Sequence, residues 1–257
     1  MYWQESLIAL ATLSRKETTR YLRIWVQTLF PPAITMALYF VIFGNLIGPR
    51  IGPMDGYSYM DFIVPGIIMM AVITNSYANV VSSFFSAKFQ RHIEELMVSP
   101  APNAVILLGY VSGGVGRGLL VGLIVTLVSL IFTQIQIHNI WITVSVVLLT
   151  SILFSLGGFI NGIFARKFDD VAIVPTFILT PLTYLGGVFY SVSLLPDTWR
   201  IVSMFNPVLY MVNAFRYGIL GSSDIDIRVA YSLILLSILI LGATALFLLR
   251  RGTGLRA

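Results

Sequence analysis

The sequence predicts an all-α polytopic membrane protein with six transmembrane helices, from its composition and its pattern of apolar runs. The 257 residues are 57% hydrophobic and 11% charged, and the mean hydropathy is +0.89. A bilayer core of ~30 Å takes about 20 apolar helical residues, and six such stretches follow one another, at about 25–47, 62–86, 105–133, 140–165, 171–192 and 229–249. The runs are continuous rather than alternating, which favours helices over a transmembrane β-barrel.

Positive charges gather on one side of these spans. The opposite loops hold Arg50, Arg200, Arg216 and Arg228 together with five aspartates. Eleven other basic residues lie before the first span, after the second, after the fourth and after the sixth: Arg15, Lys16, Arg20, Arg23, Lys88, Arg91, Arg166, Lys167, Arg250, Arg251 and Arg256. The positive-inside rule therefore predicts that both termini lie in the cytoplasm.

Residues 1–23 are predicted to form a cytoplasmic interfacial helix. Trp3, Leu7 and Ile8 precede a basic segment, and an amphipathic basic helix lies on the membrane surface. Ser14 and Glu17 have the spacing of a capping box, which would open a helix at that point. The adjacent prolines 31 and 32 either begin the first span or bend a longer helix.

A short amphipathic cytoplasmic helix is predicted within 88–102. Its charged side chains are Arg91, Glu94 and Glu95, and its apolar residues recur at helical spacing at Phe89, Ile93, Leu96 and Met97. Such a helix either floats among the lipid headgroups or docks on a cytoplasmic partner. Its charges, and a length greater than a simple turn requires, favour docking.

The segment 194–227 is the only sizeable external stretch, and half of its residues are apolar. Asn206-Pro207 breaks it into two halves. We expect a re-entrant or external hairpin that packs on the bundle, since a segment this apolar must contact the membrane.

The sequence from 179 to 216 reads LTPLTYLGGVFYSVSLLPDTWRIVSMFNPVLYMVNAFR. Its pattern consists of Leu182, Leu185, Gly186, Gly187, Leu195, Pro196, Pro207, Tyr210 and Arg216. This pattern resembles the signature of the ABC type-2 transporter permeases, with a conservative departure at Val208. The resemblance extends over the whole chain, including 89–100 and 166–170, and is closest to bacterial inner-membrane members.

That resemblance implies the transmembrane subunit of an ATP-driven exporter in a bacterial inner membrane, with no cofactor of its own. It implies a homodimer with two copies of a separate ATP-binding subunit, moving an amphiphilic, glycan, lipid or drug-like substrate outward. Residues 88–102 would then be a coupling helix that contacts the ATPase through Arg91, Glu94, Glu95 and Leu96. Pro196, Pro207, Tyr210 and Arg216 would belong to an external re-entrant gate.

The sequence itself also indicates that ATP hydrolysis needs another polypeptide. The chain contains no G-x-x-x-x-G-K-[ST] sequence, the loop that cradles nucleotide phosphates. All of its basic residues except Arg117 lie at or beyond span ends, so its positive charge does not indicate a nucleic-acid partner. His92 and His138 are the only histidines, and their separation excludes a histidine-based metal site or catalytic triad.

Arg117 is the one charge deep within a predicted span. An arginine at the bilayer centre costs ~2.5–3.5 kcal/mol on insertion scales, so it should face protein or water. Glycines surround it in small-xxx-small runs at 109/113 and 114/118/122, which permit close helix packing. Arg117 is either a structural arginine bonded to carbonyls of a neighbouring helix or a contact for an anionic substrate headgroup.

Polar residues form a stripe along the second span, at Asn75, Asn79, Ser82 or Ser83, and Ser86. They either hydrogen-bond neighbouring helices or line the translocation path, and the resemblance favours the path. Thr176, Thr180 and Tyr184 form the matching stripe on the fifth span. The charged run 166–170 is read as a solvated salt-bridge cluster, with a second ATPase contact or an inner gate as the alternative.

Two other functions remain as alternatives. A secondary transporter or channel would work without an ATPase, but ion coupling calls for an intramembrane carboxylate or inverted repeats. An intramembrane enzyme would need a catalytic constellation at depth. The sequence displays neither feature.

Overall fold

The computed structural model describes residues 3–254, and Arg256 lies outside them. The regular elements in this range are α1 (Trp3–Arg23), α2 (Trp25–Thr28), α3 (Phe30–Tyr39), the π-helix η1 (Phe40–Ile47), α4 (Gly48–Ile51), α5 (Tyr59–Phe89), α6 (His92–Val98), α7 (Asn103–Ser129), α8 (Ile140–Phe164), α9 (Phe168–Val174), the π-helix η2 (Pro175–Leu179), α10 (Thr180–Tyr184), the 3₁₀-helix η3 (Val192–Leu194), α11 (Asp197–Met204), α12 (Pro207–Leu220) and α13 (Ile227–Arg251). All are helical, which confirms the predicted all-α class for this range.

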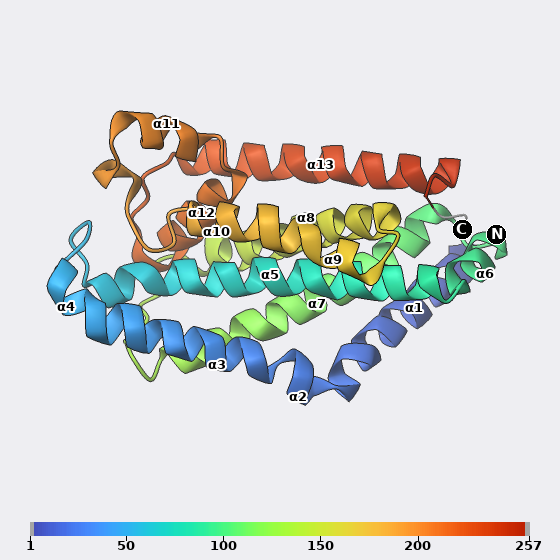
Figure 1. Ribbon diagram of the computed structural model, residues 1–257, viewed down its shortest axis with the longest axis horizontal. Coiled ribbons are helices and arrows are strands. Elements are labelled where there is room, and N and C mark those ends of the chain that lie inside the picture. The colour runs from blue at the N-terminus through green and yellow to red at the C-terminus, as the bar shows by residue number, and fades with distance from the viewer. Residues whose placement is uncertain (1–2, 255–257) are drawn as a thin grey trace.

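The helices form one elongated bundle. In Figure 1 the long helices run lengthwise, with α4 and α11 at one end. The start of α1, the loop that carries α6, and the end of α13 gather at the opposite end. We call these the α11 end and the α6 end.

Within residues 3–254, five helical units are long and apolar enough to cross a membrane: 25–51, α5, α7, α8 and α13. The segment predicted as the fifth span is shorter, because α9, η2 and α10 together end at Tyr184 instead of 192. Gly187 follows with φ +70°, a left-handed conformation that turns the chain out of the helix. The third predicted span also ends early, at Ser129 rather than 133.

Helix α5 is the centre of the bundle. Within its most apolar window 89% of the residues are buried, against 17% for both α13 and the 25–51 unit. It packs against α7, α8 and α12. A helix that is apolar over most of its circumference belongs inside a fold, and the other spans keep an apolar surface for lipid.

Glycines bring α7 close to its neighbours on two faces, which confirms them as packing residues. A Cβ on Gly113 would lie 2.5 Å from the Cβ of Glu17 in α1. On the other face, a Cβ on Gly122 would lie 2.8 Å from Val72 in α5. These contacts require the absence of a side chain, as small residues do at membrane helix interfaces.

The amino-terminal part differs from its sequence-based prediction at the capping box and decides the alternatives for the two prolines. The capping box at Ser14 and Glu17 is wrong: α1 continues to Arg23, because Leu13, Glu17 and Tyr21 form its buried face. The chain then breaks at Leu29, and both prolines fall in the first turn of α3. A proline is tolerated there because the first N–H groups of a helix have no partner.

The helix predicted within 88–102 is also shorter than expected. Helix α5 extends to Phe89, so Lys88 belongs to it, and α6 covers only His92–Val98. Arg91 separates the two helices with φ +62°. This left-handed residue reverses the chain direction, which the periodicity of the side chains did not reveal.

Gly158→Ala should destabilise the bundle. The added Cβ would lie 2.5 Å from the carbonyl oxygen of Tyr77, and backbone atoms of a packed helix move little, so we expect a loss of about 1–3 kcal/mol. Reversible unfolding in mixed micelles measures it. Gly242→Ala in α13 is the matched control, because its nearest neighbour is 3.9 Å away. Equal stability of the two variants would contradict the packing of α8 on α5.

Candidate functional site

A cluster of polar side chains joins α1 to α5. Glu17 of α1 is fully buried. Its carboxylate accepts a hydrogen bond of 2.8 Å from the Ser83 hydroxyl and one of 3.4 Å from Nε of Arg20. Nη2 of Arg20 also donates to the backbone carbonyl and to the side-chain oxygen of Asn79, at 3.0 and 2.8 Å. We call Glu17, Arg20, Asn79 and Ser83 the polar cluster.

Sequence reasoning missed the role of Glu17, which it assigned to a helix start. The available signal was the spacing of Leu13, Glu17 and Tyr21 at i, i+4 and i+8, which places the three on one helix face. This face packs on α7. A carboxylate on such a face requires a cation and donors nearby, since an unpaired buried charge is costly.

Arg117 of α7 bonds to the elbow between α1 and α3. Its Nη2 donates to the backbone carbonyl of Thr28 at 3.1 Å and to the side-chain oxygen of Asn75 at 3.0 Å. Thr28 is the last residue of α2, next to the break at Leu29. Arg117 therefore satisfies a carbonyl at the end of a neighbouring helix, as a structural arginine does.

The polar stripe of α5 is largely engaged in helix contacts. Asn75 and Asn79 are buried and accept from the two arginines. Ser82 is half-buried and donates to the carbonyl of Ala78 at 2.7 Å. The lining of a translocation path by these three side chains stays a prediction.

The matching stripe on the shorter fifth segment faces outward. Thr176, Thr180 and Tyr184 are all exposed. The Tyr184 hydroxyl lies 2.7 Å from that of Tyr39 in α3, and both rings contact Phe189. Within one copy of the chain this face of η2 and α10 is therefore exposed, and it lies beside Tyr39 of the first span.

Helix α6 presents charged and apolar side chains at the α6 end. Ile93 is buried and holds the helix on the bundle. Arg91, Glu94 and Glu95 are exposed, Leu96 is half-buried, and Val98 is 88% exposed. A groove of about 540 Å³ separates α6 from α1, and its walls include Lys16, Glu95 and Leu96.

The predicted cluster at 166–170 joins α8 to α9. Asp170 accepts hydrogen bonds from the backbone N–H groups of Arg166 and Lys167, at 2.8 and 3.0 Å, and these bonds hold the pKa of its carboxyl below the usual value. Lys88 donates to the carbonyls of Ile163 and Ala165 at the end of α8. The predicted salt-bridge cluster is therefore wrong: among the described residues this region forms no ion pair, and the Asp170 and Lys88 side chains bond to backbone groups instead.

Arg216 of α12 lies fully inside the α11 end of the bundle. Its guanidinium stacks 3.8 Å from the ring centre of Phe62, and its Nη2 donates to the carbonyl of Gly187 at 2.6 Å. Gly187 forms the turn after α10, and a Cβ on Gly66 of α5 would lie 2.7 Å from the carbonyl oxygen of Val188 in the same turn. Arg216 thus fixes the end of the fifth segment against α5.

The two prolines predicted in this region stand at helix starts. Pro196 is the N-cap of α11 and Pro207 is the first residue of α12. The Asn206 side chain accepts from the N–H of Val208 and donates to the carbonyl of Leu182. Tyr210 donates to the carbonyl of Met204 at 2.8 Å, which closes the corner between α11 and α12.

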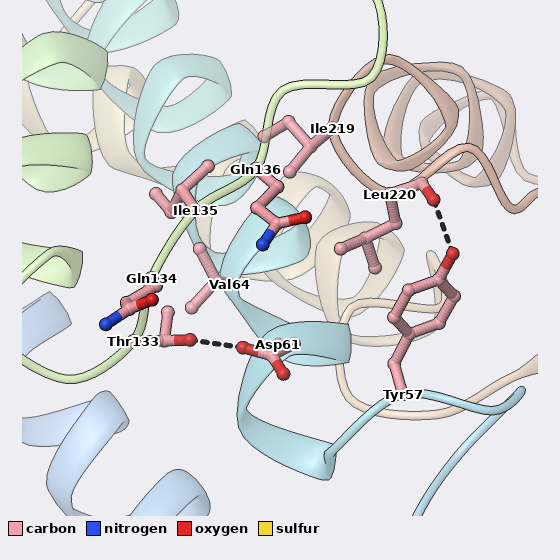
Figure 2. Close-up of a pocket in the computed structure, with 9 residues that line it drawn as sticks. All are labelled: Tyr57, Asp61, Val64, Thr133, Gln134, Ile135, Gln136, Ile219 and Leu220. Atoms are coloured by element: carbon pink, nitrogen blue, oxygen red, sulfur yellow. Dashed lines mark hydrogen bonds between the residues drawn. The ribbon is translucent and has the colours of Figure 1, made fainter.

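A half-open cavity of about 240 Å³ lies at the α11 end. Figure 2 shows Asp61 of α5 bonded to Thr133, and Tyr57 bonded to the carbonyl of Leu220. The loop that follows α7 contributes Gln134 and Gln136. No group of three metal-ligating side chains occurs among the described residues. The predicted coupling residues lie around α6 and the predicted external residues lie around α11 and α12, at opposite ends of the bundle.

Comparison with known proteins gives a consistent family. The model of the ABC-2 type transporter family matches residues 8–220. Over 258 aligned residues the chain is 57% identical to the inner membrane transport permease YadH of Escherichia coli K12, covering 100% of this chain and 99% of the relative. Nodulation protein J of Rhizobium leguminosarum bv. viciae is 21% identical over 215 residues, 83% of each chain. Nodulation protein J of Rhizobium meliloti is 23% identical over 186 residues.

Glu17→Ala should destabilise the protein more than Glu17→Gln. Alanine removes both the partner of Arg20 and the acceptor of Ser83, whereas glutamine keeps an acceptor. Breaking a buried pair costs ~3–5 kcal/mol. We expect Glu17→Ala to lower the free energy of unfolding by about 2–3 kcal/mol, because the Arg20 side chain is 31% exposed and water screens the pair. Unfolding in mixed micelles measures the loss, with the exposed Glu94→Ala as control. Stability of Glu17→Ala equal to that of the control would refute the polar cluster.

Proposed function

This chain belongs to the ABC-2 type transporter family, and on that premise we propose that it is the transmembrane subunit of an ATP-driven exporter. It would be a multi-pass protein of a bacterial inner membrane with both termini in the cytoplasm. A separate ATP-binding subunit would supply the energy, and the substrate would be amphiphilic, a glycan, a lipid or a drug-like molecule.

The observation that carries this proposal is the exposed surface of α6. Helix α6 connects α5 to α7, and its charges, together with the exposed Val98, lie outside the bundle. Apolar residues exposed beside charges are typical of protein interaction sites. A partner that contacts Arg91, Glu94, Glu95 and Leu96 would act on the ends of both spans.

Motion of the partner would pass from α6 to the centre of the bundle along two routes. The first is direct, since α6 follows α5 after a two-residue turn. The second runs through α1, which shares a groove with α6 and bonds to α5 through the polar cluster. We propose that α1, α5, α6 and α7 move as one unit during transport.

A homodimer with two ATPase copies would complete the transporter. In this arrangement α9, η2 and α10 count as the fifth of six crossings. Their exposed face, with Thr180 and Tyr184, would meet the path or the second copy. A two-fold interface uses the same surface of both subunits, so the two stripes would face each other. Asn75, Asn79, Ser82 and Arg117 would reach the path only if α1 and α7 parted from α5, which movement as one unit excludes. We therefore propose that these four residues serve helix contacts instead of the path.

The external region would form a gate that dips into the outer leaflet. Helix α11 exposes Trp199, Ile201, Val202 and Met204, and Phe205 follows it at 85% exposure. So many exposed apolar side chains on one short helix favour contact with lipid over water. Pro196, Pro207, Tyr210 and Arg216 would hold this helix in place beside the exit.

The alternative is a secondary transporter or channel, and Glu17 is the observation relevant to it. A buried carboxylate is a feature of ion-coupled transport. Glu17, however, is paired with Arg20 and bonded to Ser83, so its charge is compensated within the protein. This arrangement favours a structural role over ion coupling.

Reversal of the acidic pair on α6 tests the proposed coupling. Glu94→Lys together with Glu95→Lys should leave the protein folded, because both side chains are exposed. We expect the variant to lose co-purification with the ATPase or to uncouple ATP hydrolysis from transport. Arg228→Glu, which reverses an exposed charge at the opposite end and leaves the N-cap of α13 in place, is the control. Normal transport by the α6 variant would exclude α6 as the coupling helix.

Thiol labelling tests the external region, since the chain has no cysteine. In membranes, Phe205→Cys should resist a membrane-impermeant thiol reagent because lipid covers it, although the protein leaves it exposed. Asp197→Cys should react, and the buried Met211→Cys should resist in both membrane and detergent. Rapid reaction of Phe205→Cys in membranes would mean that the segment is a solvated loop.

A further inference from the structure

The basic flank of α1 is an exposed charged surface that the proposed function does not use. A shallow groove of about 720 Å³ runs along it, lined by Arg15, Lys16, Arg20, Arg23, Thr12 and Thr19. Arg20 is engaged in the polar cluster. Arg15, Lys16 and Arg23 are exposed. None of the three forms an ion pair with another residue in the described part of the chain.

Three charges of one sign within nine residues repel one another, so they favour an anion between them. Two donors of different geometry are available at this groove, the planar guanidinium groups and the Lys16 ammonium. The Thr19 side chain is also exposed there. Phosphate oxygens match this set, because arginine forks and hydroxyls both donate to them.

The surroundings of the groove indicate that the phosphate belongs to a lipid. Ile24 is part of the lining, and Leu22, Trp25 and Val26 next to it are 44–56% exposed. These apolar side chains continue into the first span, where they must contact acyl chains. A molecule with an anionic head and an apolar tail would therefore satisfy both parts of the surface.

We propose that the basic flank of α1 is a binding site for an anionic phospholipid of the cytoplasmic leaflet. The phosphate lies among Arg15, Lys16 and Arg23, and an acyl chain follows Ile24 and Trp25 along the first span. Occupancy holds α1 in the plane of the membrane against α7. The proposal requires that the chain lies in a membrane, but it does not depend on ATP-driven export.

Native mass spectrometry of the full-length protein tests this site directly. The purified chain is offered equal amounts of phosphatidylglycerol and phosphatidylcholine. We expect preferential retention of phosphatidylglycerol, and a drop of about tenfold or more in that retention for Arg15→Gln with Arg23→Gln, because each cation near an anionic surface contributes to binding. Arg15→Lys with Arg23→Lys keeps the charge and should restore most of it.

Arg250→Gln with Arg251→Gln is the matched control, since it removes two exposed arginines of α13 at the same end of the protein. It should retain phosphatidylglycerol like the unchanged chain. Equal retention of both lipids by the unchanged chain would overturn the proposal, and so would equal losses in the two glutamine variants. Unchanged lipid retention with lost binding of the ATPase would assign the groove to that subunit instead.

Hydrogen exchange provides a second readout that does not depend on lipid surviving ionisation. In lipid nanodiscs, phosphatidylglycerol should slow exchange of the α1 amides relative to phosphatidylcholine alone, and Arg15→Gln with Arg23→Gln should remove the difference. An α1 whose exchange is the same in both lipids would contradict the site.

Discussion

A buried charge in this bundle is costly unless another part of the chain bonds to it, because lipid acyl chains offer no hydrogen-bond partner. The main polar contacts obey this constraint, although Nδ2 of Asn79 and Nε of Arg117 have no partner within the described residues. The polar cluster and Arg117 both follow from this constraint. Glu17 is compensated by Arg20 and Ser83, and Arg117 satisfies the carbonyl of Thr28 at the break before α3. These bonds fix where α1 lies, and with it the approach to the first span.

The same bonds divide the bundle into a tightly joined part and a more open part. Helix α1 is held on α7 by close contacts at Gly109 and Gly113 and on α5 by the polar cluster. The short fifth segment, by contrast, makes few contacts along η2 and α10 and leaves Phe177 74% exposed. On the proposed function, a movement imposed at α6 would therefore be transmitted to the buried α5, and the fifth segment would be available to a second copy or to the path.

Apolar run length and the family signature were enough to predict the helical class, five of the six spans approximately and the short helix near residue 93. The span predicted at 171–192 has no helix long enough to cross a membrane among the described residues. The glycines of α7 were also recognised as packing residues, because their spacing alone places them on helix faces. Single residues with unusual backbone conformation were not predicted: Arg91 follows α5 and Gly187 lies in the turn after α10, both with positive φ values, and neither interrupts the apolar pattern. Glu17 was misassigned because its spacing with Leu13 and Tyr21 was overlooked; that spacing indicates a shared helix face, whereas the partners on α5 and α7 that bury this face are not specified by local sequence.

An engineered disulfide between α1 and α7 tests most directly whether these helices move as one unit. The hydroxyls of Ser14 and Ser112 are 2.8 Å apart, close enough for two cysteines at these positions to bond, and the chain offers no competing thiol. In the complex with its ATPase, Ser14→Cys with Ser112→Cys should hydrolyse ATP at the same rate when oxidised and when reduced. A rate that falls on oxidation and returns on reduction would show that α1 must move relative to α7, and would contradict the account.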